Sequence, residues 1–373
     1  MKRILLLIFI LSIIFSVKCT AEGTSTEDFL SSQAENIGAD ELENSLPDFA
    51  KDFLNSEGIS PENPEWVNSL TAENVFLHIW SFLKSGGKKP LVSAAGILSV
   101  ILISAALSNT EIGGNVQIAV KYAVTLSAAG VVSLPIFSVI ESAVNAMQGV
   151  TVFMTSFIPI FAAILISGGA VITSASMSSL MLFACEAVNF ISNFAVVPLL
   201  SGFTAISVAS SASPLLEKSK IADGIKKLAF WIMGTLTCVF VGILGIQTAV
   251  NASADSLTLK TAKFILGSAV PVAGTALAEA LNTVTASVGI LKSTVGVYGI
   301  VAICAIFLPL LAELLIWRLV LIFLSFVSDM FSLDSVSRLI RSADTVIAVI
   351  TGLILLTSAM FIISLGVVLT VAK

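Results

Sequence analysis

Residues 228–250 read LAFWIMGTLTCVFVGILGIQTAV, a run of 23 residues without a charged side chain. An α-helix needs about 20 apolar residues to cross the hydrocarbon core of a bilayer. Apart from closed barrels, only helices satisfy their own backbone hydrogen bonds there. The alternation of apolar and polar residues that indicates barrel strands is absent. The sequence therefore predicts an all-α polytopic membrane protein, a helical bundle. Its apolar runs are 91–108, 118–140, 150–172, 180–208, 228–250, 264–291, 295–316, 319–327 and 346–371.

The composition agrees with a chain that lies mostly in a bilayer. Mean hydropathy is +1.02, and charged residues make up 12% of the chain, against about 25% in soluble domains. The charge is uneven, because 13 of the 24 acidic residues lie between Glu22 and Glu73, where Lys51 is the only basic residue. We interpret residues 22–87 as an acidic exported segment with amphipathic helices, the last of them over 70–83.

The first 21 residues have the pattern of a secretory signal peptide. Lys2 and Arg3 precede an apolar run at 4–17, and small residues lead up to Ala21. The run is too short for an ordinary transmembrane helix. We expect cleavage after Ala21, with an uncleaved first helix as the alternative; either way, residues 22–87 are exported.

The four letters AVNA occur twice, at 143–146 and 249–252, each time 22 residues after a lysine. Further pairs of landmarks follow in the same order, which predicts a tandem duplication. Repeat 1 covers about 121–226 and repeat 2 about 227–341, within a membrane domain over 88–373 that ends in a span at 345–371. Coincidence in an apolar sequence is the alternative. The paired landmarks are Lys121 and Lys227, Pro159 and Pro271, Pro198 and Pro309, and the basic stretches 218–227 and 338–341.

The repeat constrains the topology. Basic residues near span ends favour the cytoplasm, and with both basic stretches there the two repeats are parallel. Because residues 22–87 are exported, either one apolar run before Lys218 does not cross completely, or the run at 180–208 makes two short spans broken at Pro198. We expect paired re-entrant elements at about 150–175 and 264–291, with kinks or turns at Pro159, Gly168, Gly169, Pro198, Pro271 and Pro309. The remaining six spans are 91–108, 118–140, 178–200, 228–250, 295–317 and 345–371.

Signals of enzymatic activity are weak. The stretch Gly86-Gly87-Lys88-Lys89 lacks the upstream glycine and the Ser or Thr of a nucleotide-binding loop. The cysteines after residue 21 stand alone in apolar runs, with a spacing that fits neither a metal site nor a disulfide framework. We predict that the protein is not an enzyme and has no catalytic, cofactor-binding or metal site.

Polar side chains inside apolar runs are costly in a bilayer and are therefore candidates for function. Glu186, Asn189 and Asn193 share one face of a helix, and Glu279 and Asn282 make a similar face in the second repeat. Such faces line a pathway or join helices through hydrogen bonds. We favour helix association, because a carboxyl group without a basic partner makes a poor pathway.

Two further features concern helix contacts. Small residues at helical spacing allow helices to approach closely, and the chain has such pairs in Gly242 with Gly245 and Gly296 with Gly299. Glu313 and Arg318 lie near the end of a span, where we expect them to reach toward the membrane surface and to pair with each other.

The stretch TLKTAKFILG at 258–267, followed by VPV at 270–272 and LKSTVG at 291–296, resembles the stage III sporulation protein AE family of endospore-forming bacteria. The order of signal sequence, polar exported segment and multi-span body also agrees. So do Ser156-x-x-Pro159, the Ser-Gly-Gly run at 167–169 and Pro198. The likeness covers about 90–373, whereas the acidic segment does not match in detail.

The resemblance implies a multi-pass protein of the mother-cell membrane that surrounds the forespore. It would belong to a complex similar to a secretion or feeding channel, which joins the two cells and supports late forespore gene expression. The implied partners are the other stage III sporulation A proteins, both ATPase-like and ring-forming, and the forespore stage II Q protein. Two alternatives remain open from the residues: a self-sufficient transporter of small solutes, whose site the five polar residues above would line, and a membrane scaffold without a pore.

Overall fold

The computed structural model describes residues 37–62, 66, 86–108, 114–190, 193, 198, 200–202, 204–205, 221–269 and 274–371. The proposed signal peptide, the expected helix at 70–83, Pro271 and the basic residues 218 and 220 lie outside this part of the chain. Every regular element in the described part is helical.

Six of the described helices are long and apolar enough to cross a membrane. They confirm the prediction of an all-helical fold and make the chain a candidate multi-pass membrane protein. Two short helices, α3 (Glu41–Asn44) and α4 (Asp48–Ser56), precede them. The six are α7 (Lys88–Ser108), α8 (Gly114–Ser167), α9 (Val171–Phe190), α11 (Ile221–Ala269), α12 (Gly274–Met330) and α13 (Asp334–Val371).

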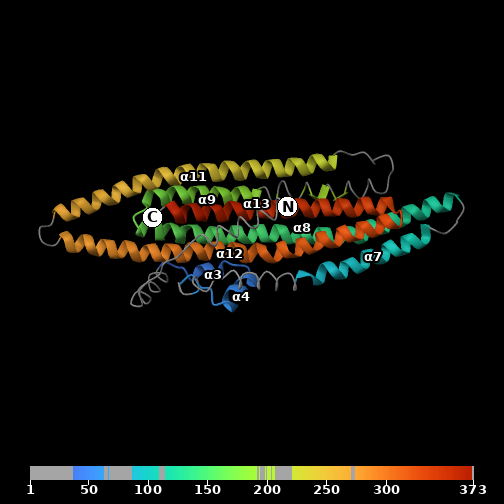
Figure 1. The fold of residues 1–373 in the computed structure, drawn as a ribbon, viewed down its shortest axis with the longest axis horizontal. Helices are drawn as coiled ribbons and strands as arrows, with labels where there is room; N and C mark the ends of the chain where they lie inside the picture. The colour runs from blue at the N-terminus through green and yellow to red at the C-terminus, as the bar shows by residue number, and fades with distance from the viewer. Residues whose placement is uncertain are drawn as a thin grey trace.

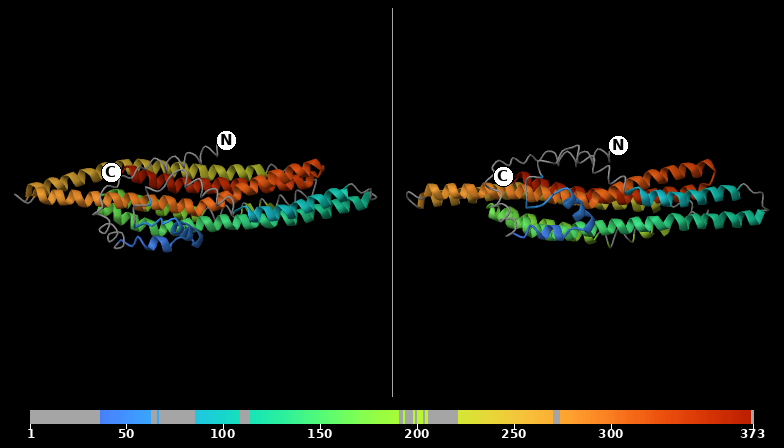
Figure 2. Two further views of the ribbon diagram at one scale, coloured as in Figure 1. Left: turned by 60° about the horizontal axis from the view of Figure 1, so that its bottom comes forward. Right: turned by 90° about the horizontal axis from the view of Figure 1, so that it is seen from below.

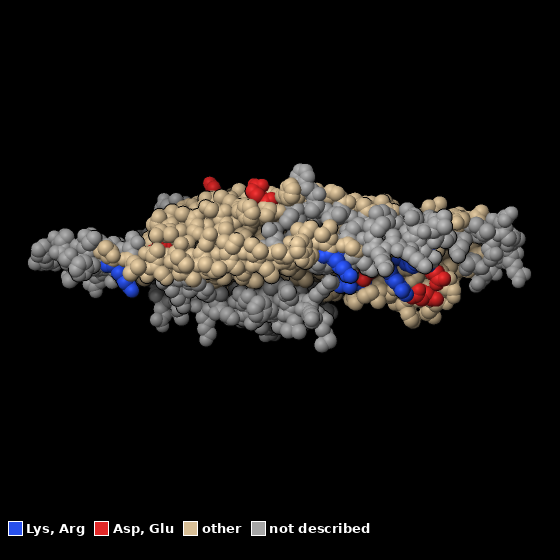
Figure 3. Space-filling model, turned by 90° about the horizontal axis from the view of Figure 1, so that it is seen from above, with Lys and Arg blue, Asp and Glu red and all other residues tan. Residues whose placement is uncertain are grey.

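The long helices lie side by side in an elongated bundle (Figures 1 and 2). The helix α13 is central, because 83% of its most apolar window is buried inside the bundle, whereas for α11 the share is 12%. The helices α8, α11 and α13 run in one direction along the bundle, and α12 runs in the other (Figure 1). Seen from above, a broad expanse shows no charged side chain, and most charges visible on this face gather toward one end (Figure 3).

The helix α8 differs from the expected arrangement. A span at 118–140 and a separate re-entrant element at 150–175 were predicted, but residues 114–167 form one helix of 54 residues. No proline interrupts 141–149, so nothing in this connection stops a helix. At 1.5 Å per residue, α8 is about 80 Å long, far longer than the roughly 30 Å of a hydrocarbon core.

The same correction applies to the second half of the chain. The apolar runs at 295–316 and 319–327 and residues 274–291 of the second re-entrant element join into α12, which has 57 residues. Residues 264–269 of that element belong to α11. The last helix starts at Asp334, earlier than the predicted start at 345. The polar residues between the apolar runs did not end these helices. Most polar side chains cost a helix little, so they affect which surface of the helix is buried and not where the helix ends.

A tight turn joins α8 to α9. Gly169 has a φ of 85°, in the left-handed region that favours glycine. The N–H of Ala170 donates to the carbonyl of Leu165 at 2.9 Å, and that of Gly169 to Ile166 at 2.8 Å, which closes the end of α8. The turn lies within the first element that was predicted to be re-entrant, and here it makes α8 and α9 an antiparallel pair.

The acidic segment packs on the bundle in this structure. Helices α3 and α4 bury Leu42, Ala50 and Leu54 and lie against α8 and α12, partway along the bundle (Figure 1). Pro47 fits against Gly149 of α8, where an added Cβ atom would lie 2.9 Å from the Cγ of the proline. The sequence predicted the amphipathic helices of this segment but gave no sign of where they dock.

Candidate functional site

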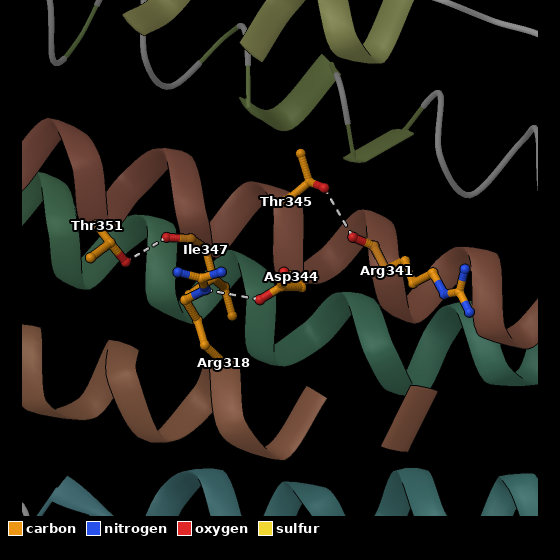
Figure 4. Close-up of polar contacts among 6 residues, drawn as sticks. All are labelled: Arg318, Arg341, Asp344, Thr345, Ile347 and Thr351. Carbon is orange, nitrogen blue, oxygen red and sulfur yellow. Dashed lines mark hydrogen bonds and ion pairs between the residues drawn. The ribbon is translucent and has the colours of Figure 1, made fainter. Parts of the chain in front are cut away.

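An ion pair joins the two most extensively packed helices. Nε of Arg318 on α12 donates to Oδ1 of Asp344 on α13 at 3.0 Å, and the side chains are 32% and 25% exposed. Figure 4 shows the two side chains pointing toward each other between the helices. Ionisable groups inside apolar helices are costly unless they are paired, so such a pair is a candidate for function. The predicted partner of Arg318 was Glu313; the structure corrects this, because Asp344 on the neighbouring helix is the partner.

The surroundings of this pair are helical backbone and small hydroxyl groups. The hydroxyl of Thr345 donates to the carbonyl of Arg341 at 3.0 Å, and that of Thr351 to the carbonyl of Ile347 at 2.7 Å (Figure 4). These bonds satisfy the hydroxyl groups within α13 itself. The side chain of Arg341 turns to Asp329, near the start of the turn between α12 and α13. Arg318 and Asp344 therefore hold the two helices in register.

A second polar contact closes the start of α9. Asp255 of α11 is 5% exposed and accepts hydrogen bonds from the backbone N–H groups of Ile172 and Thr173, both at 2.9 Å. These N–H groups lie in the first turn of α9, where a helix has no internal acceptors. A carboxylate there also meets the positive end of the helix dipole. The contact fixes α11 against the α8–α9 turn.

Sequence reasoning missed Asp255. Its partners lie 82 and 83 residues away in the chain, which no local pattern reveals. The available signal was a lone acidic residue in an otherwise uncharged stretch of α11, between 228 and 259. Nearby, the hydroxyl of Ser176 on α9 donates to Oε1 of Gln247 on α11 at 2.6 Å, so two polar contacts define the register of this helix pair.

Of the predicted polar face at 186–193, Asn193, which lies three residues past the end of α9, contacts α8. Nε2 of Gln148 on α8 donates to Oδ1 of Asn193 at 3.3 Å, and Nδ2 of Asn193 donates to the carbonyl of Asn189 at 3.1 Å. Glu186 is exposed on the outside of the helix. Glu279 and Asn282 lie in α12, but their side chains are outside the described part, so a shared face of the five residues stays a prediction.

The other residues predicted as kinks lie in different settings. Pro159 and Pro309 stand inside continuous helices, α8 and α12. Gly168 lies in the α8–α9 turn, and an added Cβ atom there would meet Cγ1 of Val288 at 3.3 Å. Pro198 is exposed and described only as an isolated residue between described segments.

Of the two predicted glycine pairs, one lies at a close helix contact and the other does not. At Gly296, an added Cβ atom would lie 2.5 Å from Cδ2 of Leu369 on α13; at Gly299, it would lie 2.6 Å from Cε2 of Phe157 on α8. These glycines allow three helices to meet closely, as in other membrane proteins. Gly242 and Gly245 on α11 have nothing within 4 Å of such an atom, so this pair makes no close helix contact within the described part of the chain.

The same three-helix junction holds a buried lysine. Lys292 of α12 is 8% exposed, and its Nζ donates to the carbonyl of Leu369 in the last turn of α13 at 3.3 Å. A positive charge there stabilises the negative end of the helix dipole. The rings of Phe153, Phe157 and Phe161 line α8 beside this junction, with centroids 5.6 and 5.2 Å apart. The arrangement joins α12 to α13 beside the aromatic face of α8.

Nothing in the described part of the chain suggests metal binding, since no group of three or more His, Cys, Asp or Glu side chains is close enough to hold an ion. The described cysteines, Cys185, Cys238 and Cys304, are free thiols. Long apolar helices joined by isolated polar contacts define a multi-pass helical membrane protein.

Comparison with known proteins gives the family. The family described as stage III sporulation protein AE matches residues 71–372, and this chain belongs to it. A relative, stage III sporulation protein AE of Bacillus subtilis (strain 168), is 26% identical over 261 residues, which cover 69% of this chain and 63% of the relative. The matched region thus spans less than two thirds of that relative. No solved structure matches the chain.

Proposed function

We propose that this protein is an integral membrane core component of the channel complex between mother cell and forespore, needed for endospore development. The observation that carries the proposal is the extent of the family match, since residues 71–372 contain all six long helices. Membership in this family makes the protein a membrane component of sporulation. We place it in the mother-cell membrane around the forespore, with the other stage III sporulation A proteins and the forespore stage II Q protein as partners.

The contacts of the described residues support a structural, non-enzymatic role in this complex. The polar side chains within the helices join one helix to another: Arg318 with Asp344, Gln148 with Asn193, and Asp255 with the start of α9. A solute pathway needs polar groups that converge on a shared cavity, and the described polar groups are spread along the bundle instead. We therefore interpret Asn189 and Asn193 as helix-contact residues.

The proposal is tested in the spore-forming host. A strain that lacks the protein should engulf normally but lose late forespore gene expression, as read by a forespore-specific fluorescent reporter. A plasmid copy should restore the signal. Normal reporter expression and normal spore yield without the protein would refute the proposal. Purified protein in liposomes should move no small solute unaided; transport that Glu186→Ala abolishes would establish the transporter instead.

A further inference from the structure

The exposed surfaces of α7, α8 and α12 carry charged residues at one common level along the bundle. Phe157 of α8 meets Gly299 of α12, and these helices run in opposite directions (Figure 1). Glu141 and Glu313 lie 16 and 14 residues from that contact toward the same end of the bundle, so the two carboxyl groups are nearly level. Gly86 lies against the backbone of Glu313, with 3.5 Å from an added Cβ atom to the amide nitrogen.

The helix α7 starts at the same level, at Lys88, two residues after Gly86, and Lys89 is exposed in its first turn. We call Gly86, Lys89, Glu141 and Glu313 the polar girdle. Glutamates and lysines commonly mark the place where a helix enters or leaves hydrocarbon, because their charges stay in water while their stems reach into lipid.

On one side of the polar girdle, most exposed side chains of α7, α8 and α12 whose burial is described are apolar, and the polar ones are the hydroxyl groups of Ser99, Tyr122, Ser127 and Ser138. Leu134 of α8 is 74% exposed and Phe323 of α12 is 60% exposed. Among the α12 residues whose burial is described, every exposed large apolar side chain lies beyond Glu313. These apolar groups are Leu91, Val92, Leu102, Ile103 and Leu107 on α7, Leu126, Leu134 and Phe137 on α8, and Leu315, Leu319, Ile322, Phe323, Phe326 and Met330 on α12.

This apolar surface has the length of a bilayer core. From Glu313 to Asp329 there are 16 residues, or about 24 Å of helix, and a hydrocarbon core is about 30 Å thick. At its other end, the apolar surface is bounded by charged, exposed side chains, which are Asp329, Asp334, Arg338 and Arg341. Arg318 and Asp344 lie between the two ends and neutralise each other in their ion pair.

On the other side of the polar girdle, the bundle carries α3 and α4. Pro47 packs on Gly149, eight residues beyond Glu141 along α8. The exposed stripe of α8 that contains Leu134 and Glu141 continues there with Asn145 and Gln148. Five carboxylates of the docked segment are exposed, and a charged carboxylate is costly in hydrocarbon. They are Asp40, Glu41, Asp48, Asp52 and Glu57.

We propose that lipid acyl chains surround only the end of the bundle formed by α7, the first part of α8, the last part of α12 and the start of α13. The part that carries α3, α4 and the α8–α9 turn stands outside the hydrocarbon, on the side where α3 and α4 lie. This places outside the bilayer the element at 150–175 that the sequence assigned to a re-entrant position. The proposal does not depend on the role in a channel.

The proposal also applies to α11. A bilayer is flat, so residues of α11 at the same level as the part of α8 outside the hydrocarbon lie outside it too. The bonds from Ser174 of α9 to the carbonyl of Ala162 on α8 and from Ser176 of α9 to Gln247 of α11 fix the register of α8, α9 and α11. They place Cys238 of α11 on the same side of the polar girdle as Val152. The exposed apolar face of α11, part of the uncharged expanse in Figure 3, then meets protein and not lipid.

The test measures contact with acyl chains at matched positions. The full chain is reconstituted into phosphatidylcholine vesicles, with or without bromine on the acyl chains, and a single cysteine carries a bimane fluorophore. Leu134→Cys and Val152→Cys compare two exposed apolar positions on one helix, 74% and 57% exposed. Phe323→Cys adds a second position inside the proposed lipid zone. Native Cys238, with the other cysteines replaced, adds a second position outside it.

We expect bromine to quench bimane at 134 and 323 several-fold more than at 152 and 238. Comparable quenching at 152 or 238 overturns the proposal, because lipid would then cover the other part of the bundle. Absence of quenching at 134 and 323 overturns it as well. Gel filtration before reconstitution identifies any variant that fails to fold. Because each zone is probed on two helices, the loss of one variant still leaves one position in that zone to compare.

Discussion

Gly299 of α12 lies directly against the ring of Phe157 of α8. An added Cβ atom would be 2.6 Å from Cε2 and 2.7 Å from Cζ of that ring, closer than packed carbon atoms approach. Phe157 is fully buried and stacked on Phe161, so the ring has little room to move. The contact fixes the separation of α8 and α12 and, through Leu365, that of α13.

Gly299→Ala should therefore destabilise the protein. Overpacking a close contact costs about 1–3 kcal/mol, more than the roughly 1 kcal/mol by which alanine favours a helix over glycine. The measurement is the midpoint of thermal unfolding in detergent. Gly242→Ala is the matched control, since an added Cβ atom there meets nothing within 4 Å, and it should leave the midpoint unchanged or raise it. A midpoint for Gly299→Ala at or above that of the wild type would contradict the packing.

Asp344→Ala should destabilise the α12–α13 pair, because it leaves the guanidinium of Arg318 without its partner. We expect a loss of about 1–3 kcal/mol, as for a partly buried charge that loses its hydrogen bond. The double variant Arg318→Asp with Asp344→Arg should recover part of the loss. Glu313→Ala serves as control, since the structure pairs Arg318 with Asp344 instead. Equal effects of Asp344→Ala and Glu313→Ala on the unfolding midpoint would argue against this pairing.

Asp255→Ala should loosen the start of α9, since two backbone N–H groups lose their acceptor. Loss of a helix cap typically costs about 0.5–2 kcal/mol. Limited proteolysis should then cut faster near the α8–α9 turn. Ser256→Ala, at an exposed neighbour whose hydroxyl bonds only within its own helix, is the control. Identical cleavage of the two variants would show that Asp255 does not hold the turn.

Glu186→Ala should leave sporulation unchanged, because this carboxyl group is exposed on the outside of α9.

Gln148→Leu should lower the amount of folded protein, because Asn193 loses its donor from α8. Spore yield and immunoblots of membrane fractions measure both outcomes. A loss of spores in Glu186→Ala with normal protein levels would indicate a direct functional role for the carboxyl group, against the helix-contact interpretation.

The sequence alone determined the class of the protein. Uncharged runs such as 228–250 require lipid or a protein interior around them, and only helices fit there, so the multi-pass helical body followed from composition and length. The turn at Gly168 and Gly169 was also readable, since it depends on local backbone freedom at glycine. The motifs at 258–296 indicated the family, which the match over 71–372 confirms.

The tertiary structure decided which residues meet. Arg318 pairs with Asp344, 26 residues away on another helix, and not with Glu313 on its own helix. Asp255 reaches the start of α9 across more than 80 residues, and Pro47 docks on Gly149. The sequence also could not show that 114–167 is one helix. Hydropathy reports the preference of each residue for water or lipid, whereas these contacts depend on the register between helices, which the packing of close surfaces such as Gly299 and Phe157 sets.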